Sequence, residues 1–565
     1  MNSQKRVKFK NVNQAIDYFA DKTPQSVAML QHEDQRQISY KKFATLIDLF
    51  ALRLIDAGLK KGDRVATQLV LVPEHVILMY ACFKIGVIIA PLDLRLKPME
   101  VVRDINKIQP TMFFFLGKTT VTDFREVAKA VQRECKSVKH FIQFANKKDK
   151  NIVSHAVSIS QFMNKIRLFY LKIKNSLCSD LKKAARDLNP RTAALIIYTT
   201  GTTGAPKPAL LCHENILVQN EILSRGIGEL KQPLCTMVNL PPSHVGCVTE
   251  TLMTTFYRGG KAILLRIFDV ELTLDAIEKH RINLLGQIPT QFRMLWAHPK
   301  YNQFDLSSLE SVIYAGSAGD LPFLKRLSAM APSIGTGLGM TENAGFATFS
   351  QLGSSAESLV GQVGSSFPDL AKVTIRQAMQ DDGHAGEELG LGETGEICYH
   401  PPIVFLGYFN QPEETQNAIS LEGILYTGDI GYFKQLDNAT VLFLSGRKKF
   451  VIKQKGYNVF PTEVEEHIVA LKGIEQVEVV GIKHQLFDEA IFGFVLLSEN
   501  SNLSVESIVQ HCQLIAAYKR PQHIEIWPSD KPLPLTRSSK VDKIALQKIA
   551  LAKVDDLRNK GAWDA

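Results

Sequence analysis

The sequence predicts an α/β protein with a large N-terminal domain and a small α+β C-terminal domain. Its 565 residues exceed the size of one compact domain. From residue 13 to residue 402, short apolar runs alternate with segments of helical periodicity, which is typical of layered α/β sheets. Beyond residue 447 the order becomes helix, strand, strand, helix and strand, which predicts a separate unit. We therefore expect domains at 1–447 and 448–565.

The N-terminal part opens with helices and strands in alternation. We expect helices at 13–23 and 40–58, and buried strands at 64–72, 86–92 and 111–117. The most apolar stretch, residues 69–92, is interrupted by Pro73, Glu74 and Lys84. It therefore predicts a buried helix and strand, because a membrane span needs an unbroken apolar run.

Residues 160–187 form a basic segment with helical spacing. The apolar residues recur three or four apart, which predicts one stripe on one helix: Phe162, Ile166, Phe169, Ile173, Leu177 and Leu181. Lysines and arginines lie mostly away from this stripe. One hypothesis is peripheral contact with an anionic membrane surface, and the alternative is a helix packed on the protein with a solvated basic face.

The alternation resumes after residue 190. Strands are expected at 193–200, 234–240, 261–268, 282–288 and 311–316, and residues 395–410 predict a β-rich subdomain with prolines at its edges. In the C-terminal part we expect helices at 461–471 and 504–518, and strands at 475–483, 489–497 and 523–528.

The composition argues against several function classes. The net charge is +9, and no basic stripe with interleaved aromatics of the kind that binds nucleic acid is present, so an anionic ligand or an acidic membrane surface explains the excess charge better. The eight cysteines include no Cys-x-x-Cys pair, which fits neither a zinc site nor a disulfide framework. The first residues lack an apolar signal core, so we expect a cytoplasmic protein with reduced thiols.

The stretch YTTGTTGAPKP at residues 198–208 has the composition of a phosphate-binding loop. Its candidate ligands are Thr199, Thr200, Gly201, Thr202, Thr203, Gly204 and Lys207. Glycines allow close approach, and successive N–H groups can form an anion-binding nest. It is not a P-loop, because Lys207 stands between two prolines. Taken alone, the stretch favours a flexible surface turn over a phosphate site.

Further stretches follow in an order that resembles the adenylate-forming superfamily of acyl- and aryl-CoA synthetases, peptide-synthetase adenylation domains and beetle luciferases. They are LPPSHVG at 240–246, YAGSAGD at 314–320, GTGLGMTE at 335–342, YTGDIG at 426–431, GRKKFVIKQKGYNVFPTEVE at 446–465 and LPLTRSSKVDK at 533–543. Each match alone is weak, but the ordered set covers nearly the whole chain. The chain looks most like an acyl-CoA synthetase.

This resemblance implies that a carboxylate attacks the α-phosphate of ATP, giving acyl-AMP and pyrophosphate, and that the acyl group then passes to coenzyme A. It implies that the 198–207 loop holds the β- and γ-phosphates and that Thr341 contacts the α-phosphate. Asp429 and Arg447 would contact the ribose, and Glu342 would help to hold Mg²⁺, for which one carboxylate is sufficient. Further implied nucleotide contacts are Gly316, Ser317, Ala318, Gly337, Leu338, Gly339 and Met340.

The resemblance also implies a mobile small domain that serves both steps. Lys540 would reach the carboxylate and the α-phosphate during adenylation. The domain would then rotate about Lys449 and present the Gly456 turn to coenzyme A. His244, Gly286 and Gly337 are expected beside the acid.

Four positions depart from the usual family pattern. Leu338 stands where an aromatic ring commonly lies beside adenine, while Ser539, Pro208 and Thr200 replace glycine, glycine and serine. None removes a charge that the chemistry needs, so these changes bear on affinity more than on the type of reaction.

Two other motifs are interpreted as coincidences. GLGETG at 390–395 fits a dinucleotide fingerprint, but the surrounding glutamates would repel a pyrophosphate, so a hairpin turn is predicted. AGSAG at 315–319 narrowly misses the hydrolase nucleophile elbow, because its first residue is Ala315.

The identity of the acid is predicted from the small residues in HVGC, GSAG and GTGLG. They leave room for an extended tail, which favours a medium- or long-chain fatty acid and a role in lipid metabolism; aryl acids such as cinnamates are the main alternative. A carrier protein in place of coenzyme A, a nucleotide sensor and a membrane-surface scaffold are further alternatives. A homodimer stays open, and no nucleic-acid partner is expected.

Overall fold

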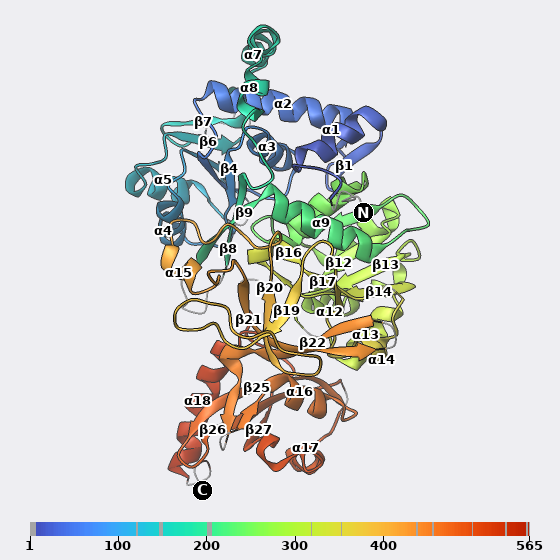
Figure 1. The fold of residues 1–565 in the computed structure, drawn as a ribbon. Coiled ribbons are helices and arrows are strands. Elements are labelled where there is room, and N and C mark those ends of the chain that lie inside the picture. The colour runs from blue at the N-terminus through green and yellow to red at the C-terminus, as the bar shows by residue number, and fades with distance from the viewer. Residues whose placement is uncertain are drawn as a thin grey trace, which may run out of the picture.

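The structure is a computed structural model that describes residues 7–119, 122–145, 151–199, 206–317, 319–351, 353–436, 439–454, 457–499, 501–536, 540–560 and 563. Within these residues, two seven-stranded sheets and a four-stranded sheet form a large domain, and a five-stranded sheet forms a smaller one (Figure 1). Figure 1 shows the smaller domain at one end of an elongated molecule, next to the four-stranded sheet. The expected fold class is confirmed.

The first seven-stranded sheet is parallel except at one edge. Its order is β7-β6-β5-β3-β4-β8-β9, and only β8 and β9 are antiparallel. Helices α2 and α3 pack on one face, and α4 and α5 pack on the other. The bounds are β3 Arg64–Gln68, β4 Ile88–Pro91, β5 Met112–Leu116, β6 His140–Phe144, β7 Ala156–Ser158, β8 Ala193–Thr199, β9 Lys207–Cys212, α2 Tyr40–Asp56, α3 Pro73–Lys84, α4 Pro98–Ile108 and α5 Arg125–Glu134.

The second seven-stranded sheet has the order β14-β13-β12-β10-β11-β1-β2, and only β1 and β2 are antiparallel. Helices α11, α12 and α13 cover one face, while α9 and α10 cover the other together with residues of the first sheet. Both sheets therefore share one apolar core. The bounds are β1 Val27–Gln31, β2 Gln37–Ser39, β10 Cys235–Val238, β11 Lys261–Leu264, β12 Leu284–Gln287, β13 Ser311–Tyr314, β14 Ser333–Thr336, α1 Asn13–Lys22, α9 His213–Ile227, α10 Thr254–Tyr257, α11 Val270–His280, α12 Pro289–Trp296 and α13 Leu321–Ser328.

Antiparallel structure follows the second sheet along the chain. Short hairpins β15–β16 and β17–β18 precede the four-stranded sheet β19-β20-β21-β22. Residues 390–394 lie in the connection between the antiparallel strands β19 and β20, and Gly395 begins β20, which agrees with a hairpin turn rather than a dinucleotide site. The bounds are β15 Gly339–Met340, β16 Gly345–Phe346, β17 Thr348–Phe349, β18 Ser365–Ser366, β19 Val373–Arg376, β20 Gly395–Tyr399, β21 Leu425–Leu436, β22 Ala439–Arg447, α14 Ala356–Leu359 and α15 Pro412–Gln416.

The C-terminal sheet has the order β24-β23-β26-β25, with β27 parallel to β26. Helices α16 and α17 pack on one face, and α18 packs on the other with its own aromatic core. The bounds are β23 Ile452–Gln454, β24 Tyr457–Val459, β25 Ile474–His484, β26 Asp488–Leu497, β27 His523–Ile526, α16 Pro461–Val469, α17 Val505–Cys512 and α18 Lys543–Asn559.

The single helix expected over residues 160–187 is wrong, because the chain forms three. Asn164 caps α7 (Lys165–Cys178) and separates it from α6 (Ile159–Phe162). Ser179 then adopts a left-handed conformation, φ 55°, which ends α7 before α8 (Asp180–Ala185). The six apolar residues consequently share no single stripe: Phe162 is buried in the body, whereas Ile166 and Leu177 are exposed.

Two other expected elements are shorter than the pattern indicated. The helix expected at 504–518 ends at Cys512, because the guanidinium of Arg520 donates hydrogen bonds to the backbone carbonyls of Gln513 and Ile515. Of residues 395–410, only Gly395–Tyr399 are a strand. Among the described helices, none is long and apolar enough to cross a membrane.

Candidate active site

The carboxyl ends of β12, β13 and β14 meet at one edge of the second sheet, and this edge carries several of the predicted site residues. Gly286 lies in β12, Gly316 and Ser317 follow β13, and Gly337 follows β14. Parallel α/β sheets bind ligands at the carboxyl ends of their strands, so this edge is the expected location. Ala318 lies outside the described residues.

Lys540 of the small domain enters this edge. A Cβ placed on Gly316 would lie 3.1 Å from Lys540 Cε and 3.7 Å from Lys540 Nζ, so the ammonium group lies over the Gly316 backbone. A short bridge between Leu535 and Val541 brackets Lys540, whose backbone carbonyl accepts a hydrogen bond from the Thr536 N–H. Burial lowers the pKa of Lys540, and Arg447 lowers it further, while Asp429 and Glu250 oppose this shift. The preceding residue, Ser539, lies outside the described residues.

Asp429 and Arg447 face the same place from neighbouring strands. They are paired in register across β21 and β22, and Arg447 Nε lies 2.7 Å from Asp429 Oδ1. Asp429 is buried, and this burial raises the pKa of its carboxyl against the influence of Arg447 and Lys540. Because the Asp429 pKa responds to Lys540, residues more than a hundred positions apart share one electrostatic environment.

Glu342 and Lys207 form a neighbouring polar group. Glu342 lies in a 3₁₀ turn, Thr341–Asn343, and the Tyr408 hydroxyl donates to its Oε1 at 2.7 Å. The Lys207 ammonium pairs with Glu414 and lies 5.2 Å from the centre of the Tyr408 ring. Burial raises the pKa of Glu342, while Tyr408, Arg447 and Lys207 lower it. Glu342 thus connects the two polar groups, and Lys207, Glu342, Asp429 and Arg447 face one region.

Thr199 and Lys207 are register partners at the ends of β8 and β9. The predicted phosphate loop between them lies outside the described residues from Thr200 to Ala205, so its prediction stays untested. Gly456 also lies outside them. Lys449 occupies a 3₁₀ turn, Lys448–Phe450, between β22 and β23.

The glycines of the GTGLG stretch do not leave the open space that was expected. A Cβ on Gly337 would lie 2.2 Å from the Thr348 carbonyl oxygen, and one on Gly339 would lie 2.0 Å from the Gly345 carbonyl oxygen. Gly339 thus allows β15 to lie close to β16, and Gly337 allows the segment before β15 to approach Thr348 of β17. Gly286 differs, since a Cβ there would meet only Thr251 Cγ2, at 3.5 Å. Leu338 is buried in the core, with its N–H bonded to the Thr348 hydroxyl, and Met340 is half-buried.

His244 lies on the same side of the site as Lys540. Its Nδ1 accepts the Gly246 N–H at 3.2 Å, and burial together with Lys540 lowers its pKa to about 4. The imidazole is therefore neutral near pH 7, which fits a packing and hydrogen-bonding role better than an acid–base role.

Sequence reasoning missed three side chains of this site. Tyr408 and Glu414 bind Glu342 and Lys207, but no motif marks them: Tyr408 comes from the loop after β20, and Glu414 comes from the short helix α15. Glu250 lies in a π-helical turn, Gly246–Met253, and burial raises its pKa to about 7 although Lys540 opposes the shift. π-Helical turns are frequent at functional sites, but no sequence pattern predicted this one.

The fold and the site together define a ligase of the adenylate-forming class: two layered α/β sheets, a β-rich part, and a small domain whose lysine enters the large one. The chain belongs to the AMP-binding enzyme family, because the model of this family matches residues 16–409. The model of the AMP-binding enzyme C-terminal domain matches residues 463–540. The expected superfamily is thereby confirmed.

Relatives of known activity support the same class. The chain is 28% identical to a long-chain-fatty-acid–CoA ligase of Bacillus subtilis, covering 86% of this chain and 85% of the relative. It is 26% identical to an indoleacetate–CoA ligase of Aromatoleum aromaticum, covering 92% and 94%. The anthranilate CoA ligase AuaEII, in complex with anthranoyl-AMP, matches the fold with a TM-score of 0.79 at 18% identity, covering 98% and 100% of the two chains. ATP-bound MatB of Rhodopseudomonas palustris matches with a TM-score of 0.75 at 22% identity, covering 95% and 99%.

The chain is an AMP-forming acid–CoA ligase, and such enzymes use ATP and coenzyme A. The relatives act on acids of different classes, so they leave the acid of this chain undetermined.

Proposed function

We propose that the chain activates a medium- or long-chain fatty acid to acyl-AMP and then transfers the acyl group to coenzyme A. The observation that carries the proposal is the position of Lys540 over Gly316, within the electrostatic reach of Asp429 and Arg447. A cation at this edge, next to a carboxylate suited to a ribose, is the arrangement that an attack on the innermost phosphate requires.

In the first step, a carboxylate oxygen attacks the α-phosphorus, and the bond to the bridging oxygen of pyrophosphate breaks. Lys540 stabilises the negative charge shared by the carboxylate and the α-phosphate. Asp429 accepts hydrogen bonds from the ribose hydroxyls, and Arg447 orients it. Thr341 contacts the α-phosphate, and Lys207 leaves Glu414 to bind the outer phosphates.

Magnesium would be held by Glu342. Among the described residues, no three or more His, Cys, Asp or Glu side chains are placed to share a metal ion. A single buried carboxylate whose other contact is the Tyr408 hydroxyl fits a cation that takes most of its ligands from phosphates and water. Such a cation would neutralise charge on the outer phosphates.

In the second step, the coenzyme A thiol attacks the acyl carbonyl as a thiolate, and the bond to the phosphate oxygen of AMP breaks. The small domain, for which we place the boundary at 447/448, rotates about Lys449 between the steps. This rotation withdraws Lys540 and brings the Gly456 turn to the site. One site thereby serves two reactions with different electrostatic needs.

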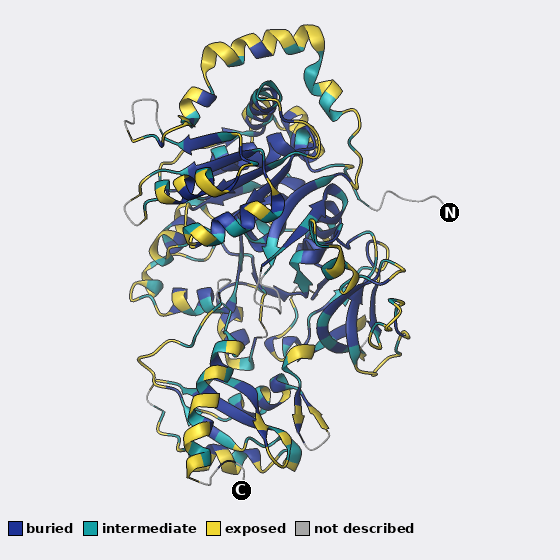
Figure 2. Cartoon of the chain, turned by 90° about the vertical axis from the view of Figure 1, so that its left-hand side faces the viewer, coloured by how far each residue is buried: buried dark blue, intermediate teal, exposed yellow. Residues whose placement is uncertain are grey.

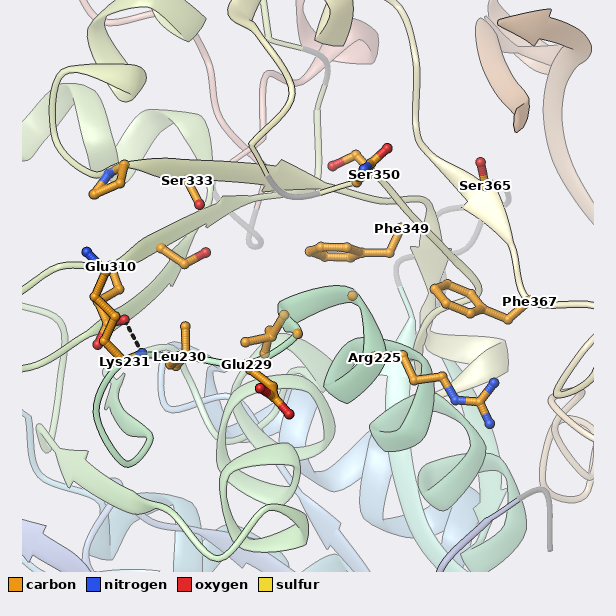
Figure 3. Close-up of a pocket in the computed structure, with 16 residues that line it drawn as sticks. Arg225, Glu229, Leu230, Lys231, Glu310, Ser333, Phe349, Ser350, Ser365 and Phe367 are labelled. Carbon is orange, nitrogen blue, oxygen red and sulfur yellow. Dashed lines mark hydrogen bonds between the residues drawn. The ribbon is translucent and has the colours of Figure 1, made fainter. Parts of the chain in front are cut away.

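A pocket at the opposite ends of β13 and β14 supports a long acyl chain. It has a volume of about 570 Å³ and is lined by the end of α9, Ser311, Ser333 and Phe349, with the charged side chains of Arg225, Glu229, Lys231 and Glu310 also in its wall (Figure 3). Ser311 and Gly316 are five residues apart along an extended segment, which places the pocket roughly 16 Å from Lys540, at the scale of a medium or long chain. In Figure 3 the Phe349 ring projects over the end of α9, and a Cβ on Gly226 would lie 2.4 Å from that ring. Phe349 would thus limit the length of the chain.

We further propose that α7 gives the protein peripheral contact with a membrane, the source of such an acid. Figures 1 and 2 show α7 projecting from the body, with an exposed outer surface. Its apolar side chains are exposed instead of buried: Ile166 82%, Phe169 67%, Tyr170 53%, Ile173 48% and Leu177 82%. Leu171, on the opposite side, is buried, and Arg167 pairs with Asp56 of α2.

The charges of α7 flank this apolar face. At 100° per residue, Lys165 and Lys172 lie along one edge of it, and Arg167 and Lys174 lie along the other. Residues 165–179 contain no Asp or Glu. Arg167 pairs with Asp56, and Lys174 Nζ lies 3.4 Å from Asp180 Oδ2, so Lys165 and Lys172 are the cations of α7 that we assign to the headgroups of an anionic bilayer. The apolar side chains beside them would enter the acyl boundary.

ATP–pyrophosphate exchange across a panel of acids tests the enzymatic proposal. We expect carboxylate-dependent exchange that rises from C6 to longer fatty acids and acyl-CoA as the product when coenzyme A is added. Faster exchange with indoleacetate or cinnamates would establish the aryl-acid alternative. Transfer to a phosphopantetheinyl carrier protein but not to free coenzyme A would establish the carrier alternative.

A further inference from the structure

A bulge in β21 presents the carboxylate that is proposed to bind the ribose. The register between β20 and β21 shifts after Glu396, so residues 427–429 of β21 stand opposite Ile397 alone. Extra residues of this kind leave the ladder and re-aim a side chain, frequently next to an active site. The direction of the Asp429 side chain therefore depends on the contacts that hold the bulge.

Glu396 of β20 supplies one of these contacts. Its Oε1 accepts a hydrogen bond from the Gly428 N–H at 2.9 Å, where φ of +73° turns the backbone of the bulge. The Thr427 hydroxyl supplies another, because it donates to the Ile397 carbonyl at 2.7 Å and accepts the Asp429 N–H at 3.0 Å. Glu396 is buried, and its charge adds to the effect of burial in raising the pKa of Asp429. The Glu396 carboxylate thus holds the bulge and lies within electrostatic reach of Asp429.

The second oxygen of the same carboxylate reaches the segment of the hinge. Glu396 Oε2 lies 2.8 Å from Lys448 Nζ, and Lys448 directly precedes Lys449 in the 3₁₀ turn between β22 and β23. The Lys448 side chain is 55% exposed, whereas that of Glu396 is 7% exposed. A buried carboxylate therefore fixes a lysine that solvent would otherwise leave free to move. One side chain joins the turn that presents Asp429 to the segment about which the small domain is proposed to rotate.

We propose that Glu396 is a positioning residue that links nucleotide binding to the orientation of the small domain. Through the bulge it directs Asp429 towards the ribose. Through Lys448 it holds the chain on the large-domain side of the hinge, so that the small domain returns Lys540 to one place. The inference deepens the proposed function and rests on it, because it assumes that Asp429 contacts the ribose and that the small domain rotates.

The two contacts of Glu396 can be removed separately. In Glu396→Gln the amide oxygen can still accept the Gly428 N–H, but the charge that pairs with Lys448 is lost. Lys448→Met removes the same ion pair from the other side and leaves the bulge unchanged. Glu396→Leu removes both contacts.

The test measures both half-reactions in these variants. ATP–pyrophosphate exchange reports the first step, and acyl-CoA formation from prepared acyl-AMP reports the second. Glu396→Gln and Lys448→Met should each lower kcat for exchange by roughly threefold to tenfold, the range of one partly exposed ion pair, while transfer stays within about threefold. Glu396→Leu should in addition raise KM for ATP by roughly tenfold, because Asp429 loses its direction.

A matched control comes from the same sheet. Lys372 Nζ lies 2.8 Å from Glu388 Oε2, and both side chains are more than 40% exposed. Lys372→Met removes an ion pair that touches neither the bulge nor the hinge, so exchange, transfer and KM for ATP should keep their wild-type values.

A double variant separates a positioning role from a merely structural one. Glu396→Gln with Lys448→Met should be no worse than either single variant, because both changes remove one pair. Additive losses, or equal losses of exchange and transfer, would overturn the inference and leave the proposed function intact. If Glu396→Leu does not fold, the other two variants and their combination decide. Absence of exchange by the wild-type protein with every acid would instead refute the proposed function.

Discussion

Replacing Lys540 with methionine should abolish adenylation while sparing thioester formation. Lys540 Nζ lies within 4 Å of a Cβ position on Gly316, at the edge where the carboxylate and the α-phosphate are to meet. At an effective dielectric constant of about 20, a cation about 4 Å from a unit negative charge contributes roughly 4 kcal/mol. If most of this interaction forms in the transition state, its loss slows the first step by about a thousandfold. Methionine keeps much of the side-chain volume, so the packing around Gly316 changes little.

Two assays separate the half-reactions. ATP–pyrophosphate exchange with a saturating fatty acid reports adenylation, and acyl-CoA formation from chemically prepared acyl-AMP reports transfer. We expect the Lys540→Met variant to lose exchange about a thousandfold but to keep transfer within about threefold. Lys548→Met, at an exposed position on α18 of the same domain, serves as the control and should leave both assays unchanged. Equal losses in the two assays would falsify the assignment of Lys540 to the first step alone.

Three further predictions follow from side chains outside the family motifs. Phe349→Ala should open the end of the pocket beside Gly226. In an exchange assay over C8 to C18 acids, the preferred chain length should increase by roughly two to four carbons, because each buried CH₂ contributes about 0.8 kcal/mol. An unchanged preferred length would show that the acyl chain does not reach this pocket. Changing Ile166, Phe169, Ile173 and Leu177 to serine should abolish flotation of the protein with phosphatidylserine-containing vesicles. The control variant Leu486→Ser/Leu514→Ser changes side chains that are 70% and 77% exposed and should still float. Flotation that survives the first change, or that is equal on neutral vesicles, would contradict the membrane role of α7. Burial raises the pKa of Glu250 from 4.5 to about 7, so its contribution to stability is present at low pH and is lost as the pH rises through 7. Glu250→Gln should therefore gain about 2 kcal/mol of unfolding free energy relative to wild type between pH 5 and pH 8 in urea titrations, and parallel pH curves for the two proteins would refute the shift.

Residue patterns predicted the elements near the motifs well but failed where helix caps or the close approach of a neighbouring backbone, which apolar spacing does not report, decided the structure. The strand before the phosphate loop and the α+β order of the last domain follow from apolar spacing, and the structure contains both. The helix expected over 160–187 failed because Asn164 and Ser179 interrupt it, and spacing alone does not register caps. The small residues of GTGLG were interpreted as room for a substrate, yet Gly337 and Gly339 accommodate a neighbouring backbone. The sequence does not distinguish a glycine that leaves room for a substrate from one that leaves room for a neighbouring backbone.

The sequence by itself determined the class of reaction, because an ordered set of charged and glycine-rich motifs specifies which groups a nucleotide and an acid will meet. Only the tertiary structure decided which of these charged groups affect one another's pKa, since Lys540, Asp429 and Glu250 come from three elements and interact through space. It also supplied the partners that no motif marks, such as Tyr408 on Glu342 and Glu396 between Gly428 and Lys448. Hydrogen bonding and desolvation depend on distances between side chains, and those distances exist only once the chain has folded.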